Sequence, residues 1–263
     1  MADATLGTPG RPQSATGHTT LLSGENASLL LGKHLLGFPN ERLRRLLSQK
    51  NLFLTFEGKR RATYANAYRC AYLDALSLQH EHASIPEPPL PVKASRIRAS
   101  ASTVSVAAAK LAFRTFNHLR NGEALYHDIT SDLPRIHGCE VPRRSPEEAA
   151  SILLELAREH DFTLFEFFQT DEAGHAQSFD AALEALDKLD AMLRALVASL
   201  RPQEGILITS DHGNVEDLSL RQHTTNRVPV FGFGRAAPAV LGITSLLDVY
   251  PTLVRLVLGA DEA

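Results

Sequence analysis

The second half of the chain alternates short apolar runs with longer amphipathic segments. Apolar runs at residues 162–168, 205–209 and 228–233 predict strands, and a similar run at residues 62–67 predicts one in the first half. Residues 179–200 predict a helix, because one side of it carries Leu183, Leu186, Leu189 and Leu193. Strands that alternate with helices in this way are typical of parallel sheets. The pattern therefore predicts an α/β fold with a doubly wound, mostly parallel sheet flanked by helices.

Capping side chains mark where four further helices begin. The first is expected near Ser14, after a stretch rich in glycine and proline. Asn40 is an N-cap signal for a second helix that ends near Gly58. A third begins after Ser145, which is followed by a proline at the first helical position and by a glutamate three residues after the cap. Residues 245–258 predict the closing helix, with an aspartate at the capping-box position.

Residues 70–144 differ in pattern from the segments on either side. They are rich in proline and small residues, and residues 102–119 predict a helix of small side chains. An excursion between two strands commonly lies over the carboxyl edge of the sheet. We therefore expect residues 1–69 and 145–263 to form the core, with residues 70–144 as a cap-like insertion.

Composition and charge exclude several classes of protein. A net charge of -3 over 263 residues, with 22% of them charged, lacks the basic excess of a nucleic-acid binder. No apolar run approaches the roughly 20 residues that span a bilayer, so no membrane association is expected. The N-terminus lacks the apolar core of a secretory signal, and Cys70 and Cys139 do not have a metal-binding spacing. The expectation is a cytoplasmic protein with reduced thiols.

Aspartate and histidine side chains follow two of the predicted strands. Asp171 and His175 come after the run at 162–168, Asp211 and His212 come directly after the run at 205–209, and His223 follows. Each segment alone is more often a helix cap or a surface residue. Their joint occurrence at comparable positions favours one metal centre at the carboxyl edge of the sheet. Carboxylates beside imidazoles suit Mn²⁺, Zn²⁺ or iron better than Ca²⁺.

Ser14 lies where a loop meets the first predicted helix. Backbone N–H groups at such a junction can receive a phosphate, and a hydroxyl beside a divalent metal ion loses its proton more readily. Ser14 is therefore a candidate nucleophile for phosphoryl transfer. Two alternatives stay open from the local sequence: Ser14 acts only as an N-cap, or Thr16 is the nucleophile on the same grounds.

Taken together, these motifs resemble the alkaline-phosphatase superfamily, and within it the metalloenzyme domain shared by cofactor-independent phosphoglycerate mutase and phosphopentomutase. The resemblance covers most of residues 12–69 and 145–259. It is carried by the segments Thr209-Ser-Asp-His-Gly-Asn214, His223-Thr-Thr-Asn226, Asp171-x-x-x-His175, Ser14-Ala-Thr-Gly-His18 and Leu247-Asp-Val-Tyr-Pro-Thr-Leu253. Only the Asp-His-Gly-Asn segment is specific by itself, whereas the combination is highly specific.

The resemblance implies two divalent metal ions, with Mn²⁺ preferred and Zn²⁺ as the alternative. By this similarity one ion would be bound by Asp171, His175 and His223, and the other by Asp211, His212 and Ser14. Ser14 would attack a substrate phosphate that bridges the two ions, and a phosphoserine would form. The partner implied is a small phosphorylated metabolite, acted on by a phosphatase or phosphodiesterase.

The chain also departs from the family pattern. The family begins with a strand that ends in an Asp-Gly pair, and here only 13 residues precede Ser14. The chain therefore looks N-terminally truncated, and one ligand of the second metal has no counterpart. In the short insertion, His127 and Asp128 are the most site-like pair, with a structural role as an equal alternative. Two other functions stay open: a phosphomutase, or a metal-binding pseudoenzyme without turnover. Substrate and oligomeric state are open as well.

Overall fold

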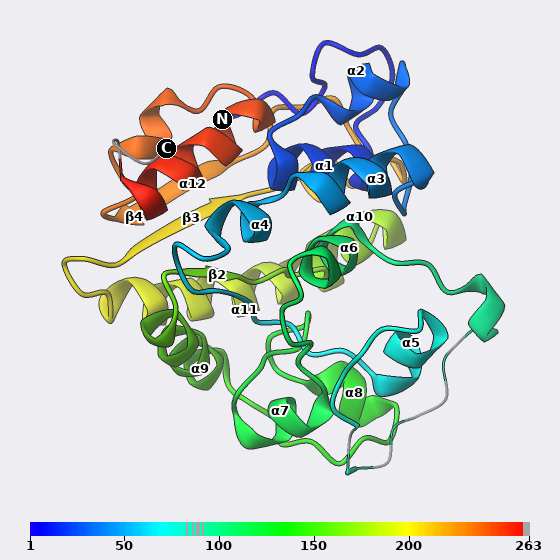
Figure 1. The fold of residues 1–263 in the computed structure, drawn as a ribbon, viewed down its shortest axis with the longest axis vertical. Coiled ribbons are helices and arrows are strands. Elements are labelled where there is room, and N and C mark those ends of the chain that lie inside the picture. The colour runs from blue at the N-terminus through cyan, green and yellow to red at the C-terminus, as the bar shows by residue number, and fades with distance from the viewer. Residues whose placement is uncertain (83, 86, 88–89, 91, 260–263) are drawn as a thin grey trace.

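The computed structural model describes residues 1–82, 84–85, 87, 90 and 92–259. The described chain is a mixed α/β fold in which helices outnumber strands (Figure 1). The α-helices are α1 (Ser14–Ser23), α2 (Ala27–Leu31), α3 (Glu41–Gln49), α4 (Leu52–Phe56), α5 (Cys70–Ala75), α6 (Ala101–Ala108), α7 (Phe116–Asn121), α8 (Asp132–Ile136), α9 (Pro146–Glu159), α10 (Gln169–Ala176), α11 (Phe179–Ala198) and α12 (Val249–Leu258). Short 3-10 helices are η1 (Ala94–Arg96), η2 (Ala239–Gly242) and η3 (Leu246–Asp248).

The strands form two small sheets in the part of the chain that the structure describes. β1 (Ala62–Tyr64) pairs in parallel with β2 (Phe162–Leu164), and β3 (Gly205–Thr209) pairs with β4 (Val230–Gly234) in antiparallel register. The expectation of a mostly parallel, doubly wound sheet was wrong in this respect. A parallel neighbour needs a crossover helix, and residues 210–229 between β3 and β4 contain none, so β4 returns in the opposite direction.

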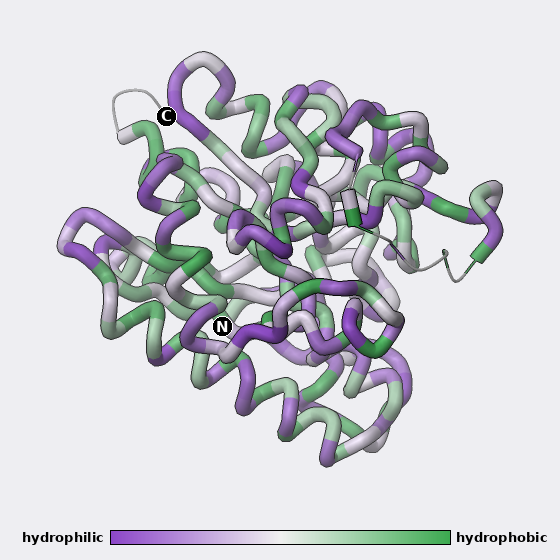
Figure 2. Tube along the Cα trace, turned by 90° about the horizontal axis from the view of Figure 1, so that it is seen from below, coloured by the Kyte–Doolittle hydropathy of each residue, from purple (hydrophilic) through white to green (hydrophobic). Residues whose placement is uncertain are grey.

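Helices cover the strands on two sides (Figure 1). On one side α9 packs against α11, where Met192 and Leu196 join a buried cluster. On the other side α4, α6 and α12 contribute to a second cluster that includes Phe56 and Phe162, whose ring centroids lie 5.1 Å apart. Along the helices the hydropathy changes repeatedly between hydrophobic and hydrophilic positions, as expected for helices with one buried face (Figure 2).

Most of the predicted helix starts are confirmed. α1 begins at Ser14, and the Asn40 side chain accepts a hydrogen bond of 3.1 Å from the backbone N–H of Leu43 at the start of α3. Ser145 forms a capping box at the start of α9, and Ser245 forms one with the aspartate three residues later. These elements are encoded locally, because a cap satisfies N–H groups that the helix itself leaves without partners.

Several predicted elements are shorter than expected, and local contacts explain why. The second predicted helix is split into α3 and α4 because Asn51 caps a new helix start. The small-residue helix is split into α6 and α7 at Lys110, whose φ of 53° lies in the left-handed region. β2 ends at Leu164, because the Asn66 side chain accepts a hydrogen bond from the backbone N–H of Glu166 and donates one to its carbonyl.

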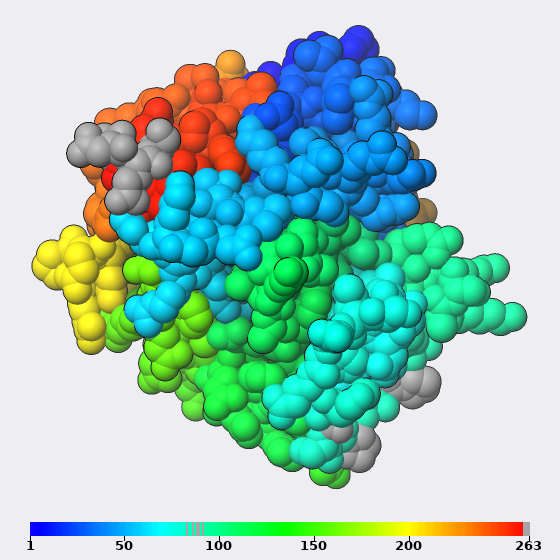
Figure 3. All heavy atoms as spheres, in the orientation of Figure 1, coloured from blue at the N-terminus to red at the C-terminus, as the bar shows by residue number. Residues whose placement is uncertain are grey.

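The segment expected to form a cap contributes to two parts of the molecule. α5, α7 and α8 gather at one end, coloured cyan to green in Figure 3, whereas α6 packs against α1, α3 and α4 in the core. The boundary at residues 70–144 stays a prediction. Among the helices that the structure describes, none has the length and apolarity needed to cross a membrane.

Replacing Phe56 by alanine should destabilise the protein by about 3–5 kcal/mol, because its side chain is fully buried against Phe162 and its loss leaves a cavity. Urea unfolding followed by circular dichroism measures this. Phe38→Ala is the matched control: Phe38 is 51% exposed, so its loss should change stability by less than about 0.5 kcal/mol. Equal effects of the two substitutions would contradict this assignment of the core.

Candidate metal centre

Three separate segments bring their aspartate and histidine side chains together. Asp171 and His175 lie on α10, Asp211 and His212 directly follow β3, and His223 lies on the connection to β4. Ligand atoms of Asp171, His212 and His223 all lie within 4.8 Å of one another. Asp171 and His175 are four residues apart on α10, and this spacing places both side chains on one side of the helix. Their role as metal ligands stays a prediction, and the geometry is the evidence for it.

Two imidazoles and one carboxylate form the first half of the centre. His175 Nε2 lies 3.1 Å from His223 Nε2, and each of these nitrogens lies 3.4 Å from an Asp171 oxygen. Because a carbonyl can only accept, His175 Nδ1 donates to the carbonyl of Arg221 at 2.8 Å, and His223 Nδ1 donates to that of Pro12 at 3.0 Å.

The carbonyl contacts fix the tautomers of both rings. With Nδ1 protonated, each neutral imidazole directs the lone pair of Nε2 at the other ring and at the carboxylate. Three electron-rich atoms then converge on one point, which repels unless a proton or a metal ion lies between them. A backbone carbonyl that orients a histidine in this way is the usual second contact of a metal-binding imidazole. The residues therefore fit a divalent metal ion.

Ser14 lies at the second half of the centre. Its Oγ is 2.9 Å from His212 Nε2, which is itself 3.3 Å from Asp211 Oδ2. The His212 ring also stacks on the His223 ring, with centroids 3.5 Å apart, so the two halves adjoin. Asp211 Oδ2 and His212 Nδ1 are buried without a hydrogen-bond partner. Buried polar atoms of this kind need an explanation, and a bound cation supplies one.

Thr16, the competing candidate nucleophile, occupies a different environment. Its side chain is fully buried, and its hydroxyl donates to the carbonyl of Gln13 at 2.9 Å. The hydroxyl also accepts a weak contact of 3.4 Å from the backbone N–H of Leu35. Ser14 at the start of the same helix faces His212 instead. The geometry therefore favours Ser14 over Thr16.

Nearby carboxylates favour positive charge on two histidines at the centre, whereas burial lowers the pKa of His212. Burial would raise the pKa of Asp171, but hydrogen bonds with His223 and Asn214 outweigh it and lower the pKa to about 2. Burial would lower the pKa of His223, but its contact with Asp171 raises it. Burial likewise opposes a charge on His18, and the nearby carboxylates, Asp211 first, raise its pKa. A field that stabilises imidazolium also stabilises a metal cation.

Two further residues hold the ligands in place: Asn214, which ends a motif quoted from the sequence but was given no role there, and Glu216, which the sequence analysis did not name. Asn214 donates through Nδ2 to Asp171 Oδ1 at 2.6 Å. The Glu216 carboxylate accepts from the Asn214 backbone N–H at 2.6 Å, from the Thr224 hydroxyl and from Asn226 Nδ2 at 3.1 Å. Glu216 therefore ties the loop after β3 to the loop that carries His223. Glu216 lies in a segment without helical or strand periodicity, so the sequence pattern gives no signal for this role.

Close backbone contacts at the centre require glycine at two positions. A Cβ at Gly17 would lie 2.4 Å from the carbonyl oxygen of Asp211, and one at Gly174 would lie 2.4 Å from the Asn214 side chain. His18, one residue after Gly17, faces the same Asp211 with Nε2 3.6 Å from Oδ2. It is a further imidazole at this edge that was not among the predicted ligands.

The His127–Asp128 pair lies outside this group of ligands. Asp128 is fully buried and accepts hydrogen bonds from the backbone N–H groups of Ser131 at 2.9 Å and Leu133 at 2.6 Å. The His127 ring stacks on Phe168, which precedes α10, with centroids 4.8 Å apart. These contacts support the structural alternative for Asp128, and they place the segment against the helix that carries Asp171.

Comparisons with known proteins agree with this geometry. A family model described as "Metalloenzyme superfamily" matches residues 11–257. The 2,3-bisphosphoglycerate-independent phosphoglycerate mutase of Methylobacillus flagellatus is 33% identical over 108 residues, which cover 38% of this chain and 21% of the mutase. The corresponding mutase of Chromobacterium violaceum is 38% identical over 100 residues, which cover 35% and 19%. The chain thus spans about a fifth of the length of these curated relatives.

The fold has a counterpart among solved structures. The alkaline phosphatase from the Antarctic bacterium TAB5 superposes with a TM-score of 0.57, covering 97% of this chain and 87% of that one. Sequence identity is 12%, so this likeness shows the fold alone. The alkaline-phosphatase-like architecture is therefore present, although the strands that the structure describes form smaller sheets than expected.

Substituting Glu216 by glutamine should weaken metal binding about 10- to 100-fold, because the variant loses the charged acceptor that joins the two ligand loops. Titration with Mn²⁺ in a calorimeter measures the affinity. Asp217→Asn is the matched control, since within the described part of the chain its carboxylate accepts hydrogen bonds only from Ser219. Unchanged affinity in Glu216→Gln would remove this residue from the support of the centre.

Proposed function

The chain belongs to the Metalloenzyme superfamily, and we propose that it is a metal-dependent phosphoryl-transfer enzyme that hydrolyses a small phosphorylated substrate through Ser14. The observation that carries this proposal is the 2.9 Å contact between Ser14 Oγ and His212 Nε2, at the edge of the convergent aspartates and histidines. A phosphatase or phosphodiesterase needs a nucleophile beside a concentrated positive charge, and this arrangement offers both.

The ligand sets follow from the two halves of the centre. Asp171, His175 and His223 would hold one divalent ion, and Asp211 and His212 would hold a second close to Ser14. Mn²⁺ is the preferred ion and Zn²⁺ the alternative, since mixed imidazole and carboxylate ligands suit both. Bound ions would lower the pKa of the Ser14 hydroxyl and offset the charge of the substrate phosphate.

The protein's own groups perform the remaining tasks. The Ser14 oxygen attacks phosphorus, the bond from phosphorus to the leaving oxygen breaks, and a phosphoserine results. Ser14 is the first residue of α1, so the phosphate on it would lie at the positive end of the helix dipole. Water then attacks the phosphoserine, which releases inorganic phosphate and restores the hydroxyl. The absence of a side chain at Gly17 allows α1 to approach the Asp211 backbone this closely.

A phosphomutase is the second candidate, and the curated relatives favour it. The relatives that match 35–38% of this chain are named as phosphoglycerate mutases. A mutase would return the phosphoryl group from Ser14 to its own substrate in place of water. The serine chemistry is the same in both proposals, and only the final acceptor differs.

Ser14→Ala should reduce the Mn²⁺-dependent turnover of p-nitrophenyl phosphate at least about a hundredfold, because no other residue takes over a lost nucleophile. Ser14→Thr retains a hydroxyl and should recover part of the activity. Ser48→Ala is the control: Ser48 lies on α3, and its hydroxyl donates to the Arg44 carbonyl away from the centre. Equal turnover in Ser14→Ala and the parent protein would remove Ser14 from the mechanism.

Hydrolysis in water enriched in oxygen-18 should place the label in the released inorganic phosphate. The reason is that water, and no substrate hydroxyl, is the proposed final acceptor. Mass spectrometry of the phosphate measures the label. A phosphorylated metabolite whose phosphate moves to a new position without label would establish the mutase. Stoichiometric metal binding without turnover of any phosphate ester would instead indicate a pseudoenzyme.

A further inference from the structure

A second group of potential metal ligands lies in the segment around α5. The ligand atoms of Asp74, His80 and His82 all lie within 4.8 Å of one another. Asp74 is on the last turn of α5, and the two histidines follow a turn at Ser77, whose φ is 55°. The rings of His80 and His82 lie 4.9 Å apart between centroids. None of the three residues belongs to the centre at Ser14.

His80 is buried in a way that leaves one ring nitrogen without a partner. Its side chain is 3% exposed, and its Nδ1 donates to the carbonyl of Leu78 at 2.9 Å. Its Nε2 is buried and makes no hydrogen bond. With the proton on Nδ1, the lone pair of Nε2 is directed at Asp74 Oδ1, which is 3.6 Å away. A lone pair and a carboxylate oxygen face each other, which is unfavourable without a cation between them.

The distance between the ligand atoms of His80 and Asp74 suits a tetrahedral ion. Ligand bonds of about 2.0–2.1 Å in tetrahedral geometry separate two ligand atoms by about 3.3 Å. The 3.6 Å between His80 Nε2 and Asp74 Oδ1 is close to this value and too long for a hydrogen bond. The Leu78 carbonyl on His80 Nδ1 also matches the usual second contact of a metal-binding histidine.

We infer that Asp74, His80 and His82 bind one divalent transition-metal ion, with Zn²⁺ as the best fit to two imidazoles and one carboxylate. Three protein ligands leave the fourth position to water. The ion would join α5 to the segment that follows it, which is otherwise connected to α5 by backbone hydrogen bonds in the turn at residues 76–78 and by Cys70 Sγ, which contacts the Glu81 carbonyl at 3.6 Å. Without an ion, the position of Asp74 on the last turn of α5 is unfavourable, because a carboxylate there lies at the negative end of the helix dipole.

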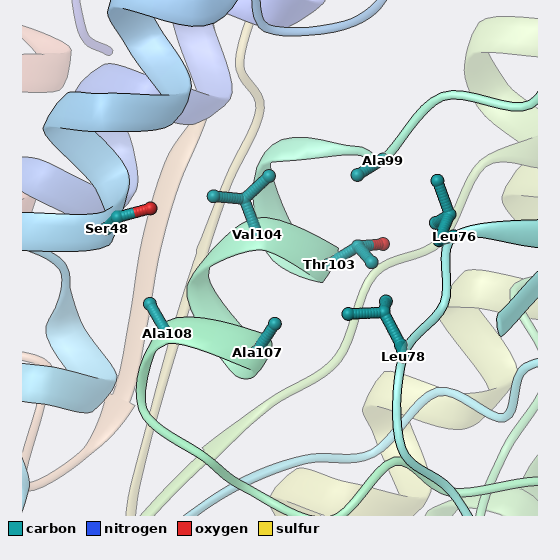
Figure 4. Close-up of a pocket in the computed structure, with 8 residues that line it drawn as sticks. All are labelled: Ser48, Leu76, Leu78, Ala99, Thr103, Val104, Ala107 and Ala108. Carbon is teal, nitrogen blue, oxygen red and sulfur yellow. The ribbon is translucent and has the colours of Figure 1, made fainter.

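The joined segment also borders an apolar hollow. Leu76 and Leu78 lie on the same side of α6 as Thr103 and Ala107, whereas Val104 points to the opposite side of that helix, as Figure 4 shows. The remaining lining residues are Ser48, Ala99 and Ala108. Since Leu78 lies between Asp74 and His80 in sequence, an ion bound there fixes the leucine side of the hollow against α6. The site therefore lies apart from the proposed chemistry at Ser14 and would hold this segment in place.

Zn²⁺ binding to the full chain tests the inference. Asp211→Asn combined with Asp171→Asn serves as the background, because it removes ligands of the other centre. Equilibrium dialysis with metal analysis should find one tightly bound Zn²⁺ per chain in this background. Adding Asp74→Asn should weaken that binding at least about tenfold, since even an indirect contact to a metal is typically worth this much. His137→Ala, which removes an exposed imidazole elsewhere, should leave it unchanged.

Cobalt spectroscopy provides an independent readout. Co²⁺ bound in this background should show the intense visible bands of a four-coordinate site, and His80→Asn and His82→Ala should abolish them. Circular dichroism establishes whether the buried His80 variant folds. If it does not fold, the Asp74→Asn variant tests the site, because the Asp74 side chain is 58% exposed and its substitution should leave the fold intact. Zn²⁺ affinity and Co²⁺ bands that are the same with and without Asp74→Asn would overturn the inference and leave a simple ion pair between His80 and Asp74.

Discussion

The convergence of Asp171, His175 and His223 is the constraint on which the rest of the centre depends. Two imidazole nitrogens 3.1 Å apart, beside a carboxylate, repel one another unless positive charge lies between them. The surrounding contacts all hold this unfavourable arrangement in place. Backbone carbonyls fix the rings, Asn214 fixes the carboxylate, and Glu216 holds the two loops together. So many contacts that hold converging ligand atoms in place are what a site for the proposed cation requires.

The ligand positions could be predicted from the sequence, whereas the sheet could not. Asp211 follows an apolar run, and Asp171 and His175 lie four residues apart on one helix, so the local pattern indicated where these candidate ligands lie, whereas their role as ligands stays a prediction. The strand pairing depends on contacts between distant residues. Asn66 ends β2 by binding the backbone of Glu166, and nothing in the local sequence of either residue indicates this pairing.

Candidate site residues that belong to a sequence motif could be identified from the sequence, whereas residues whose role depends on how loops fold could not. Motif spacing identifies side chains that recur in a family, which is why Ser14 and His212 stood out. Glu216 acts on Asn214, Thr224 and Asn226, and its role depends on how two loops fold back on each other. His80 and His82 lie beyond a turn from Asp74, so their proximity to it is set by a backbone conformation at Ser77 that residue type does not predict.

The contact between the Pro12 carbonyl and His223 joins residues 211 positions apart, and that between Ser14 and His212 joins residues 198 apart. Closing loops of this length is entropically unfavourable, so both contacts depend on the native packing of the first residues against the loop after β3. An unfolded chain carries the same side chains without bringing them together. The candidate centre therefore exists only as a property of the folded topology.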